Sequence, residues 1–275
     1  MDGRGAVRVR LDVSYDGTDF AGWAVQPEQR TVAGVLGDAL RTLYGVDRVD
    51  RLTVAGRTDA GVHATGQVCH LDLDLAELPG NALHRLNRFL PDDVRVRALA
   101  AVPASFDARF SATHRRYEYR VTDAAYGAEP LRRRDTVAWP RPLDADRLAA
   151  ASAGLLGEHD FAAYCRRKDN ATTIRALTRL DWRRDGDILL ATVQADAFCQ
   201  AMVRSLVGAL LPVGDGRRGP DWPASLLGRA ERAGEVTVAP AHGLTLVEVG
   251  YPDAAEYAAQ DARTRRLRTL PAGTP

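Results

Sequence analysis

The chain has 275 residues, of which 45% are hydrophobic and 27% are charged, and its formal net charge is +1. These values are typical of a soluble globular protein, and the length fits one large domain or two of ordinary size. A membrane span is excluded, since no apolar stretch approaches the ~20 residues that cross a bilayer. Residues Met1 to Arg10 are charged and lack the apolar core of a signal peptide, so we expect a cytoplasmic protein.

The cysteines are few and scattered: Cys69, Cys165 and Cys199 lie far apart in the sequence. Their spacing indicates neither a disulfide framework nor a zinc site. No glycine-rich segment matches a phosphate-binding loop or a dinucleotide fingerprint. We therefore expect no metal and no cofactor.

The positive charge is almost entirely arginine, because Lys168 is the only lysine. A GC-rich genome would produce the same excess. Arginine also suits phosphate and base recognition through its planar guanidinium group, and its clustering predicts a charged groove on a nearly neutral protein. The clusters are Arg115–Arg116, Arg132–Arg134 and Arg166–Lys168.

The first half of the chain predicts a mixture of strands and helices. Val7 to Tyr15 alternates between apolar and polar residues, which is the pattern of a half-buried strand. Thr31 is a candidate N-cap, and the apolar spacing after it predicts a helix that stops at Gly45. The other elements expected in this half are strands at 49–55, 67–73 and 94–102, and a helix over 81–90 that buries Leu83, Leu86 and Phe89.

The second half shows the same mixture without obvious sequence identity to the first. His114 to Thr122 alternates as a strand, with Tyr117 and Tyr119 on one face. The other expected elements are helices over 144–156, 200–211 and 223–233, strands at 176–184, 187–195 and 244–249, and a loop at 126–134. We expect a frayed helix or disorder after Pro252.

Strands and helices mix in both halves with few clean right-handed crossovers, so we expect an α+β fold. Two sheet-plus-helix lobes are predicted, with a break near 103–110. The N-terminal lobe covers 1–105 and carries the loop described next, and the C-terminal lobe covers 106–275.

The segment Gly56–Ala64 is the strongest candidate for chemistry. It follows a predicted strand, its two glycines favour turns, and the neighbours of Asp59 are small. Arg57 places a permanent positive charge near Asp59, which favours the ionised carboxylate. This pattern predicts a loop that presents one anionic nucleophile or base. An ordinary Asx-turn or cap is the alternative that the loop by itself leaves open.

Two further residues have both a functional and a plain interpretation. Tyr117 follows two arginines, and aromatic rings beside guanidinium groups hold unpaired bases, although tyrosines on strands usually serve packing. Arg204 lies opposite the apolar face of the expected helix over 200–211, where a solvent-exposed arginine is the simpler interpretation.

Taken together, five segments resemble the tRNA pseudouridine synthase A family, in the family's order and over almost the whole chain. They are Tyr15–Trp23, Gly56–Ala64, Phe106–Ala112 with Arg116–Tyr119, Phe198–Arg204 and Ala239–Leu244. The resemblance implies two α/β lobes that share a mainly antiparallel sheet with a central cleft, which is the pseudouridine synthase fold. It also implies a homodimeric isomerase that uses no metal or cofactor.

Members of this family isomerise uridine to pseudouridine at positions 38 to 40 of the tRNA anticodon stem-loop. By this resemblance Asp59 is the catalytic aspartate, which attacks C1′ of the ribose or C6 of the base, or acts as a base. Arg204 would pair with the aspartate, and Arg57 would help to extrude the nucleotide. Tyr117 would stack on the target uracil and is a candidate for removing its C5 proton, and Leu244 would line the uracil pocket.

The chain departs from the family pattern at two places. Ala24–Val25 precede Gln26, which usually comes earlier, and Ala201 stands where asparagine or glutamine is frequent. Two rival functions stay open from the residues. A non-catalytic RNA-binding or RNA-folding protein would not need the intact loop around Asp59, and a glycoside hydrolase or nucleosidase would need a second acid, which is not evident.

Overall fold

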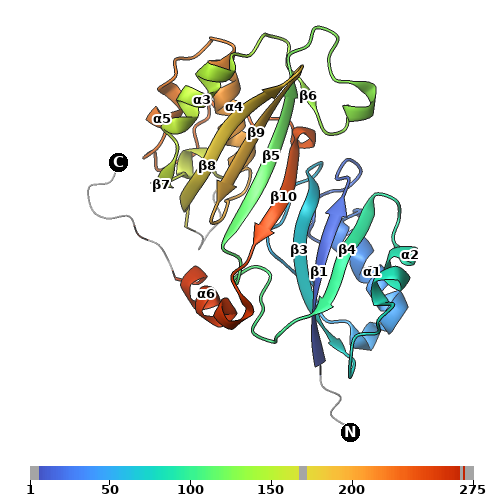
Figure 1. Ribbon diagram of the computed structural model, residues 1–275. Helices are drawn as coiled ribbons and strands as arrows, with labels where there is room; N and C mark the ends of the chain where they lie inside the picture. The colour runs from blue at the N-terminus through green and yellow to red at the C-terminus, as the bar shows by residue number, and fades with distance from the viewer. Residues whose placement is uncertain (1–5, 167–171, 267–268, 270–275) are drawn as a thin grey trace. The chain divides into compact units, whose positions relative to one another are not determined.

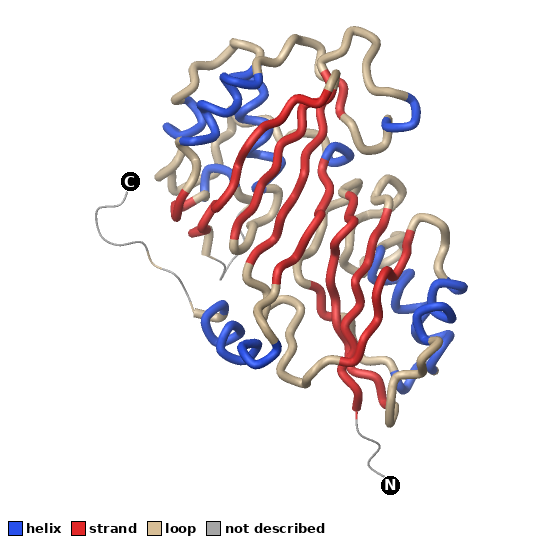
Figure 2. The backbone as a smooth tube through the Cα atoms, in the orientation of Figure 1, coloured by secondary structure: helices blue, strands red, loops and turns tan. Residues whose placement is uncertain are grey.

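The protein is described by a computed structural model that covers residues 6–166, 172–266 and 269. Within these residues the chain divides into two compact units, which are described separately. Unit 1 contains residues 6–113 and 246–266, and unit 2 contains residues 114–166 and 172–245. Both units combine helices with mainly antiparallel strands, which confirms the α+β class (Figures 1 and 2). The expected lobe boundary at 105/106 stays a prediction.

Unit 1 is built on antiparallel strands. They are β1 (Ala6–Tyr15), β2 (Thr53–Val54), β3 (His63–Asp74), β4 (Val94–Ala101) and, from its third residue onward, β10 (Leu244–Gly250). Their order is β4-β1-β3-β10, and β2 pairs with β3. Val9, Leu11 and Val13 of β1 have no exposed surface, so the alternation predicted for this strand is confirmed.

The helices of unit 1 are α1 (Val32–Tyr44), α2 (Ala82–Phe89) and α6 (Tyr257–Thr264). α1 begins and ends as predicted, because the Thr31 hydroxyl accepts a hydrogen bond from the Gly34 amide and the helix stops at Gly45. Figure 1 shows α1 and α2 on the same side of the strands β1, β3 and β4. Leu36 and Leu40 of α1 are fully buried.

Two predictions for unit 1 were wrong in part. The strand expected at 49–55 is reduced to β2 and an isolated bridge at Val49. In α2, Leu86 is buried as predicted, but Phe89 is 51% exposed. Phe89 is the last residue of the helix.

The segment after Pro252 contains an ordered helix. Tyr257 at the start of α6 is buried, and its ring lies 5.1 Å from that of Phe106. Gln260 donates a hydrogen bond to the carbonyl of Ala112. The last part of the tail, 267–268 and 270–275, lies outside the described residues.

Unit 2 has a second set of strands. They are β5 (His114–Thr122), β6 (Val137–Ala138), β7 (Gly157–Asp160), β8 (Ile174–Asp185), β9 (Ile188–Ala195) and the first two residues of β10. Their order is β5-β9-β8-β7 with antiparallel pairing, and β6 pairs parallel to β5. β5 has the bounds that the sequence predicted, with Tyr117 opposite Val193 of β9.

The helices of unit 2 are α3 (Ala145–Ala153), α4 (Met202–Gly214) and α5 (Trp222–Ser225). Figures 1 and 2 show them gathered on one side of β8 and β9. The apolar face predicted for α4 is buried: it comprises Val203, Leu206, Val207 and Leu210. The helix expected over 223–233 ends after one turn, because residues 228–232 are all exposed and offer no apolar face to pack.

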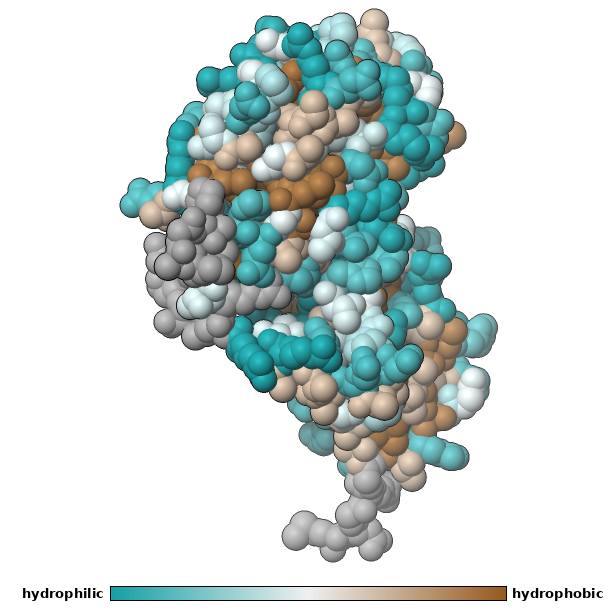
Figure 3. All heavy atoms as spheres, turned by 60° about the vertical axis from the view of Figure 1, so that its left-hand side comes forward, coloured by the Kyte–Doolittle hydropathy of each residue, from teal (hydrophilic) through white to brown (hydrophobic). Residues whose placement is uncertain are grey.

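On the face drawn in Figure 3, hydrophilic residues predominate and hydrophobic ones form smaller areas between them. Scattered apolar surface of this kind is normal for a folded chain. No helix in the described parts of the chain has both the length and the apolar character to cross a bilayer.

Candidate active site

Asp59 lies in unit 1, on the loop that joins β2 to β3. The amide of Val62 donates to the carbonyl of Asp59 at 3.2 Å, which closes a turn. Gly61 has φ 76° within this turn, a backbone conformation that side chains disfavour and that the third position of a type II turn requires. Asp59 is half-buried, whereas Arg57 is exposed. The loop thus presents the carboxylate from a fixed turn.

The segment 15–23 holds this loop from the side. The Trp23 amide donates to the carbonyl of Thr58 at 3.1 Å, and the Gly61 amide donates to the carbonyl of Phe20 at 3.3 Å. Two motifs that are far apart in the sequence therefore form one hydrogen-bonded piece of structure. The sequence predicted both motifs but not this contact between them.

His63 fastens the end of the loop to the same segment. Its ring is buried, and its Nδ1 lies 3.0 Å from the Gly17 amide and 3.1 Å from a carboxylate oxygen of Asp16. The sequence assigned no role to this histidine. The signal that could have found it is its position inside the Gly56–Ala64 motif, next to buried Val62.

Tyr117 lies in unit 2, in the middle of β5, and only 7% of it is exposed. Its ring packs edge-on against Phe198, with the ring centroids 5.2 Å apart and the planes at 86°. Edge-to-face contacts of this kind stabilise aromatic pairs by about 0.5–1.5 kcal/mol beyond area burial. Phe198 belongs to the segment Phe198–Arg204 that resembles the family. Its contact restrains the orientation of the Tyr117 ring.

Arg204 is in the first turn of α4 and is half-buried. Its Nε donates to the carbonyl of Ala239 at 2.7 Å, and the Ala239 amide donates to the Arg204 carbonyl at 3.0 Å. Two bonds therefore tie α4 to the motif that ends at Leu244. The simpler interpretation of Arg204 as a freely exposed residue is wrong.

Leu244 is the first residue of β10 and is buried. The short 3-10 helix Ala241–Gly243 precedes it. The phenol of Tyr119, a fully buried residue of β5, donates to the carbonyl of Pro240 at 3.1 Å, and burial raises the pKa of this phenol. Leu244 thus has a fixed position relative to the strand that carries Tyr117.

Ala201 occupies a special backbone position. It is the residue before α4 and has φ 64° and ψ 4°, in the left-handed region. Asparagine and glycine adopt this conformation more readily than alanine. Alanine in place of the asparagine that is frequent in the family is therefore unfavourable for this backbone conformation.

The structure brings the predicted site residues together in two groups. Asp59 and Arg57 share one loop of unit 1. Tyr117, Arg204 and Leu244 lie in unit 2, where hydrogen bonds link their elements through residues 239–240. The pairing of Arg204 with Asp59 stays a prediction. In the described chain, no group of three or more His, Cys, Asp or Glu side chains is placed to hold a metal ion.

The arginine clusters are less uniform than the sequence suggested. Arg115 is only 5% exposed, and its Nη1 donates to the carbonyl of Asp196 at 2.8 Å, so it is a structural residue. The alternation of β5 contains this signal, because Arg115 shares a face with Tyr117. Residues 132–134 and Arg166 are exposed, and the rest of the third cluster lies outside the described residues.

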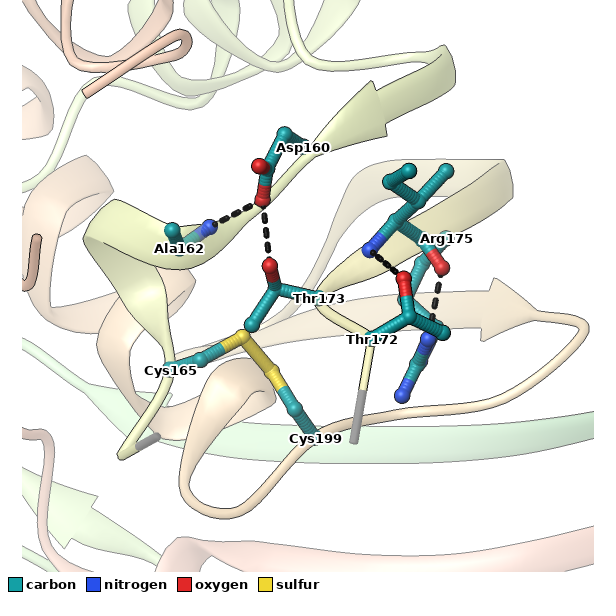
Figure 4. Close-up of a disulfide and its surroundings, with 8 residues drawn as sticks. Asp160, Ala162, Cys165, Thr172, Thr173, Arg175 and Cys199 are labelled. Atoms are coloured by element: carbon teal, nitrogen blue, oxygen red, sulfur yellow. Dashed lines mark hydrogen bonds between the residues drawn. A yellow bond between two sulfur atoms is a disulfide. The ribbon is translucent and has the colours of Figure 1, made fainter. Parts of the chain in front are cut away.

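The spacing of the cysteines did not indicate a disulfide, but one pair forms one. Cys165 and Cys199 are joined, across a sequence separation of 34 and with their Cα atoms 5.6 Å apart (Figure 4). Distance along the chain did not reveal this, because the folding of unit 2 brings the turn before α4 against the segment after β7. Cys69 is a free, buried thiol whose pKa is raised by burial.

Hydrogen bonds order the surroundings of the disulfide (Figure 4). Asp160 accepts from the Ala162 amide at 3.0 Å and from the Thr173 hydroxyl at 2.5 Å. Next to Cys165, the Arg166 amide donates to the Gln200 carbonyl at 3.0 Å. The turn that precedes α4 is thus held at both Cys199 and Gln200.

Comparison with known proteins agrees with the resemblance in the sequence. The model of a family described as tRNA pseudouridine synthase matches residues 151–252. A tRNA pseudouridine synthase A of Frankia casuarinae is 60% identical over 268 residues, which are 97% of this chain and 97% of the relative. Relatives of the same name from Streptomyces griseus and Mycobacterium leprae are 55% and 51% identical, and cover 97% and 96% of this chain and 96% of each relative.

The α+β fold and these identities define an isomerase of the pseudouridine synthase class. The likeness extends over nearly all of the chain and of its relatives. The chain belongs to the tRNA pseudouridine synthase A family. The family recognised from five segments of the sequence is thereby confirmed.

Proposed function

We propose that this enzyme isomerises uridine to pseudouridine at positions 38 to 40 of the tRNA anticodon stem-loop, with Asp59 as the nucleophile. Family membership supports the reaction class. The observation that carries the assignment of the residue is the fixed turn on which Asp59 is presented. Its backbone is tied at Thr58, Gly61 and Val62.

The reaction balances without a cofactor. The bond between N1 of uracil and C1′ of the ribose breaks, and a bond between C5 and C1′ forms. C5 gives up its proton, and N1 gains one. A carboxylate nucleophile divides such a substitution into two easier steps.

Two arginines are the proposed counter-charges of Asp59. Arg57 comes from the same loop, and the Arg204 guanidinium is oriented by its bond to the Ala239 carbonyl. Nearby cations favour the charged form of a carboxylate when a substrate displaces water. Arg204 therefore acts as the counter-charge, and Arg57, the exposed one, assists extrusion of the nucleotide.

The target base must leave its stack, which costs a few kcal/mol. Tyr117 offsets part of this cost by stacking on the uracil. The edge contact with Phe198 holds the tyrosine ring in a fixed orientation for this stacking. Leu244 provides an apolar wall of the uracil pocket. Tyr117 is also the group proposed to remove the C5 proton.

Exposed arginines would bind the tRNA backbone. Residues 132–134 and Arg166 belong to this set, whereas the buried Arg115 does not. Such binding weakens as salt rises, because it releases counterions. We further propose that the enzyme works as a homodimer in the cytoplasm.

Unmodified tRNA transcripts test the proposed site. Each transcript carries uridine at only one of positions 38, 39 and 40, so that the set covers the three positions. A control transcript carries cytidine at all three. We expect pseudouridine at the single uridine and none in the control, as mapped by mass spectrometry of the anticodon fragment. Tight binding of every transcript without any pseudouridine would instead indicate an RNA-folding protein.

A further inference from the structure

Gln67 is a polar residue in the interior of unit 1. It lies on β3 and has no exposed surface. A buried amide is unfavourable unless its hydrogen bonds are satisfied. Its Nε2 donates to the Gly56 carbonyl at 2.9 Å and to the Tyr15 hydroxyl at 3.2 Å, and its Oε1 accepts from the Val68 amide at 3.2 Å. Both polar atoms of the amide are therefore engaged.

Tyr15, at the end of β1, continues this chain of bonds. Its hydroxyl is 2.8 Å from the Thr58 hydroxyl. Since the Gln67 amide nitrogen can only donate, the phenol oxygen accepts from it, and either hydroxyl can donate in the bond between Tyr15 and Thr58. Burial raises the pKa of Tyr15 to about 12, so the phenol keeps its proton at neutral pH.

The bonds reach the loop on both sides of Arg57 and just before Asp59. Gln67 holds the Gly56 carbonyl, and Tyr15 holds the Thr58 side chain while the Trp23 amide holds the Thr58 carbonyl. A shift of the loop at this point would break several buried bonds at once. Buried polar networks of this kind impose one conformation when every member is satisfied.

We infer that Gln67 and Tyr15 are positioning residues, which act through Gly56 and Thr58 to place the Asp59 carboxylate for attack on the nucleotide. The inference rests on the proposed role of Asp59. Both residues act through the loop and do not touch the substrate themselves. The attacking oxygen must lie about 3–3.5 Å from its carbon in the correct orientation, and a misplacement of about 1 Å costs on the order of 100-fold in rate.

Two single variants remove the bonds with little change in volume: Tyr15→Phe deletes the hydroxyl, and Gln67→Met deletes the amide. Tyr164→Phe is the matched control. Tyr164 is also fully buried, and its hydroxyl donates to the Pro223 carbonyl at 2.5 Å in unit 2. Each of these changes leaves a buried polar group without its partner, so all three are expected to lower the melting temperature.

The kinetic test separates positioning from stability. We expect kcat for pseudouridine formation to fall by about 10- to 100-fold in Tyr15→Phe and Gln67→Met. KM and tRNA affinity should stay within about 3-fold, because binding does not need the aligned carboxylate. Tyr164→Phe should keep kcat within about 2-fold at a comparable loss of melting temperature. The double variant should lose less than the product of the two effects, since both residues serve one network.

Amide hydrogen exchange gives a readout that does not depend on turnover. The amides of Gly61 and Val62 should exchange faster in Tyr15→Phe and Gln67→Met than in the wild type, and at the wild-type rate in Tyr164→Phe. Unchanged loop exchange, or a kcat equal to that of the control, would overturn the inference. Failure of the proposed function gives a different result, because the wild type itself would then make no pseudouridine. The exchange measurement would still test whether Gln67 and Tyr15 hold the loop.

Discussion

Gly17 and Val62 lie in backbone contact. A Cβ on Gly17 would fall 2.0 Å from the carbonyl oxygen of Val62, closer than atoms can approach. Only glycine lets the segment after β1 come this near to the loop that carries Asp59. The Gly17 amide also donates to the His63 ring, so the two segments are joined at the same point.

Replacement of Gly17 by alanine should push this loop away from its support. We expect Gly17→Ala to lower the free energy of unfolding by about 1–3 kcal/mol, the usual cost of overpacking, and to reduce kcat as well. Urea denaturation measures the first effect. Gly80→Ala is the control, because a Cβ there meets no atom within 4 Å. Equal stabilities for the two variants would contradict the contact.

The left-handed backbone of Ala201 predicts a stabilising substitution. Ala201→Gly should raise the free energy of unfolding by about 1 kcal/mol, because alanine pays a steric penalty at φ 64° that glycine does not. Ala150→Gly, on the exposed face of α3, should lower it by about 1 kcal/mol. If both variants were destabilised alike, Ala201 would not occupy the left-handed region in solution.

The Cys165–Cys199 disulfide determines how many cysteines an alkylating reagent can modify. Alkylation of the unfolded protein without reductant should modify Cys69 alone, and alkylation after reduction should modify all three cysteines. Intact mass distinguishes one added group from three. Labelling of all three without reductant would show that the bond is absent.

Loss of the disulfide should also lower stability. The bond closes a loop across a sequence separation of 34, and cross-links of this span stabilise by about 2–4 kcal/mol through the unfolded state. We expect a loss of that size in Cys165→Ser with Cys199→Ser, measured by urea denaturation without reductant. Adding reductant should bring the wild type to the same value and leave the double variant unchanged.

His70 predicts a dependence of stability on pH. Burial lowers the pKa of His70 below its ordinary value of 6.5, and the Nδ1 of its ring accepts a hydrogen bond from the Ala108 amide at 3.0 Å. The folded state therefore binds the proton less well than the unfolded state. Neutral His70 therefore contributes its full share of the stability above pH 6.5. This share is lost as the pH falls from 6.5 towards the lower pKa that His70 has in the folded state.

The test replaces this histidine alone. Between pH 7.5 and pH 5 the wild type should lose more of its free energy of unfolding than His70→Asn, whose side-chain oxygen can accept the same bond without titrating. The other histidines are common to both proteins, so the difference isolates His70. Superimposable pH profiles would contradict the prediction.

The sequence predicted the elements whose signals are local. Alternation placed β1 and β5 with nearly their observed bounds, and Thr31 and Gly45 marked the ends of α1. The loop around Asp59 was recognised because its residues are contiguous. These features depend on neighbours within a few positions, which a single sequence displays.

Features that depend on distant contacts could not be predicted in the same way. Gln67 lay at the edge of an expected strand with nothing to show that Tyr15 and Gly56 would satisfy its amide. The Cys165–Cys199 pairing depends on how unit 2 folds. Phe89 was expected inside because the apolar spacing of α2 does not reveal where its packing surface ends.

Asp59→Asn tests most directly whether Asp59 is the nucleophile. The change keeps the size of the side chain and removes its charge, and Asp74→Asn, at an exposed end of β3, is the matched control. The measurement is the single-turnover rate of pseudouridine formation at positions 38 to 40 with saturating enzyme. We predict a loss of at least about 1,000-fold for Asp59→Asn, with tRNA binding retained and the control unaffected. A rate within about 10-fold of the wild type would contradict the assignment.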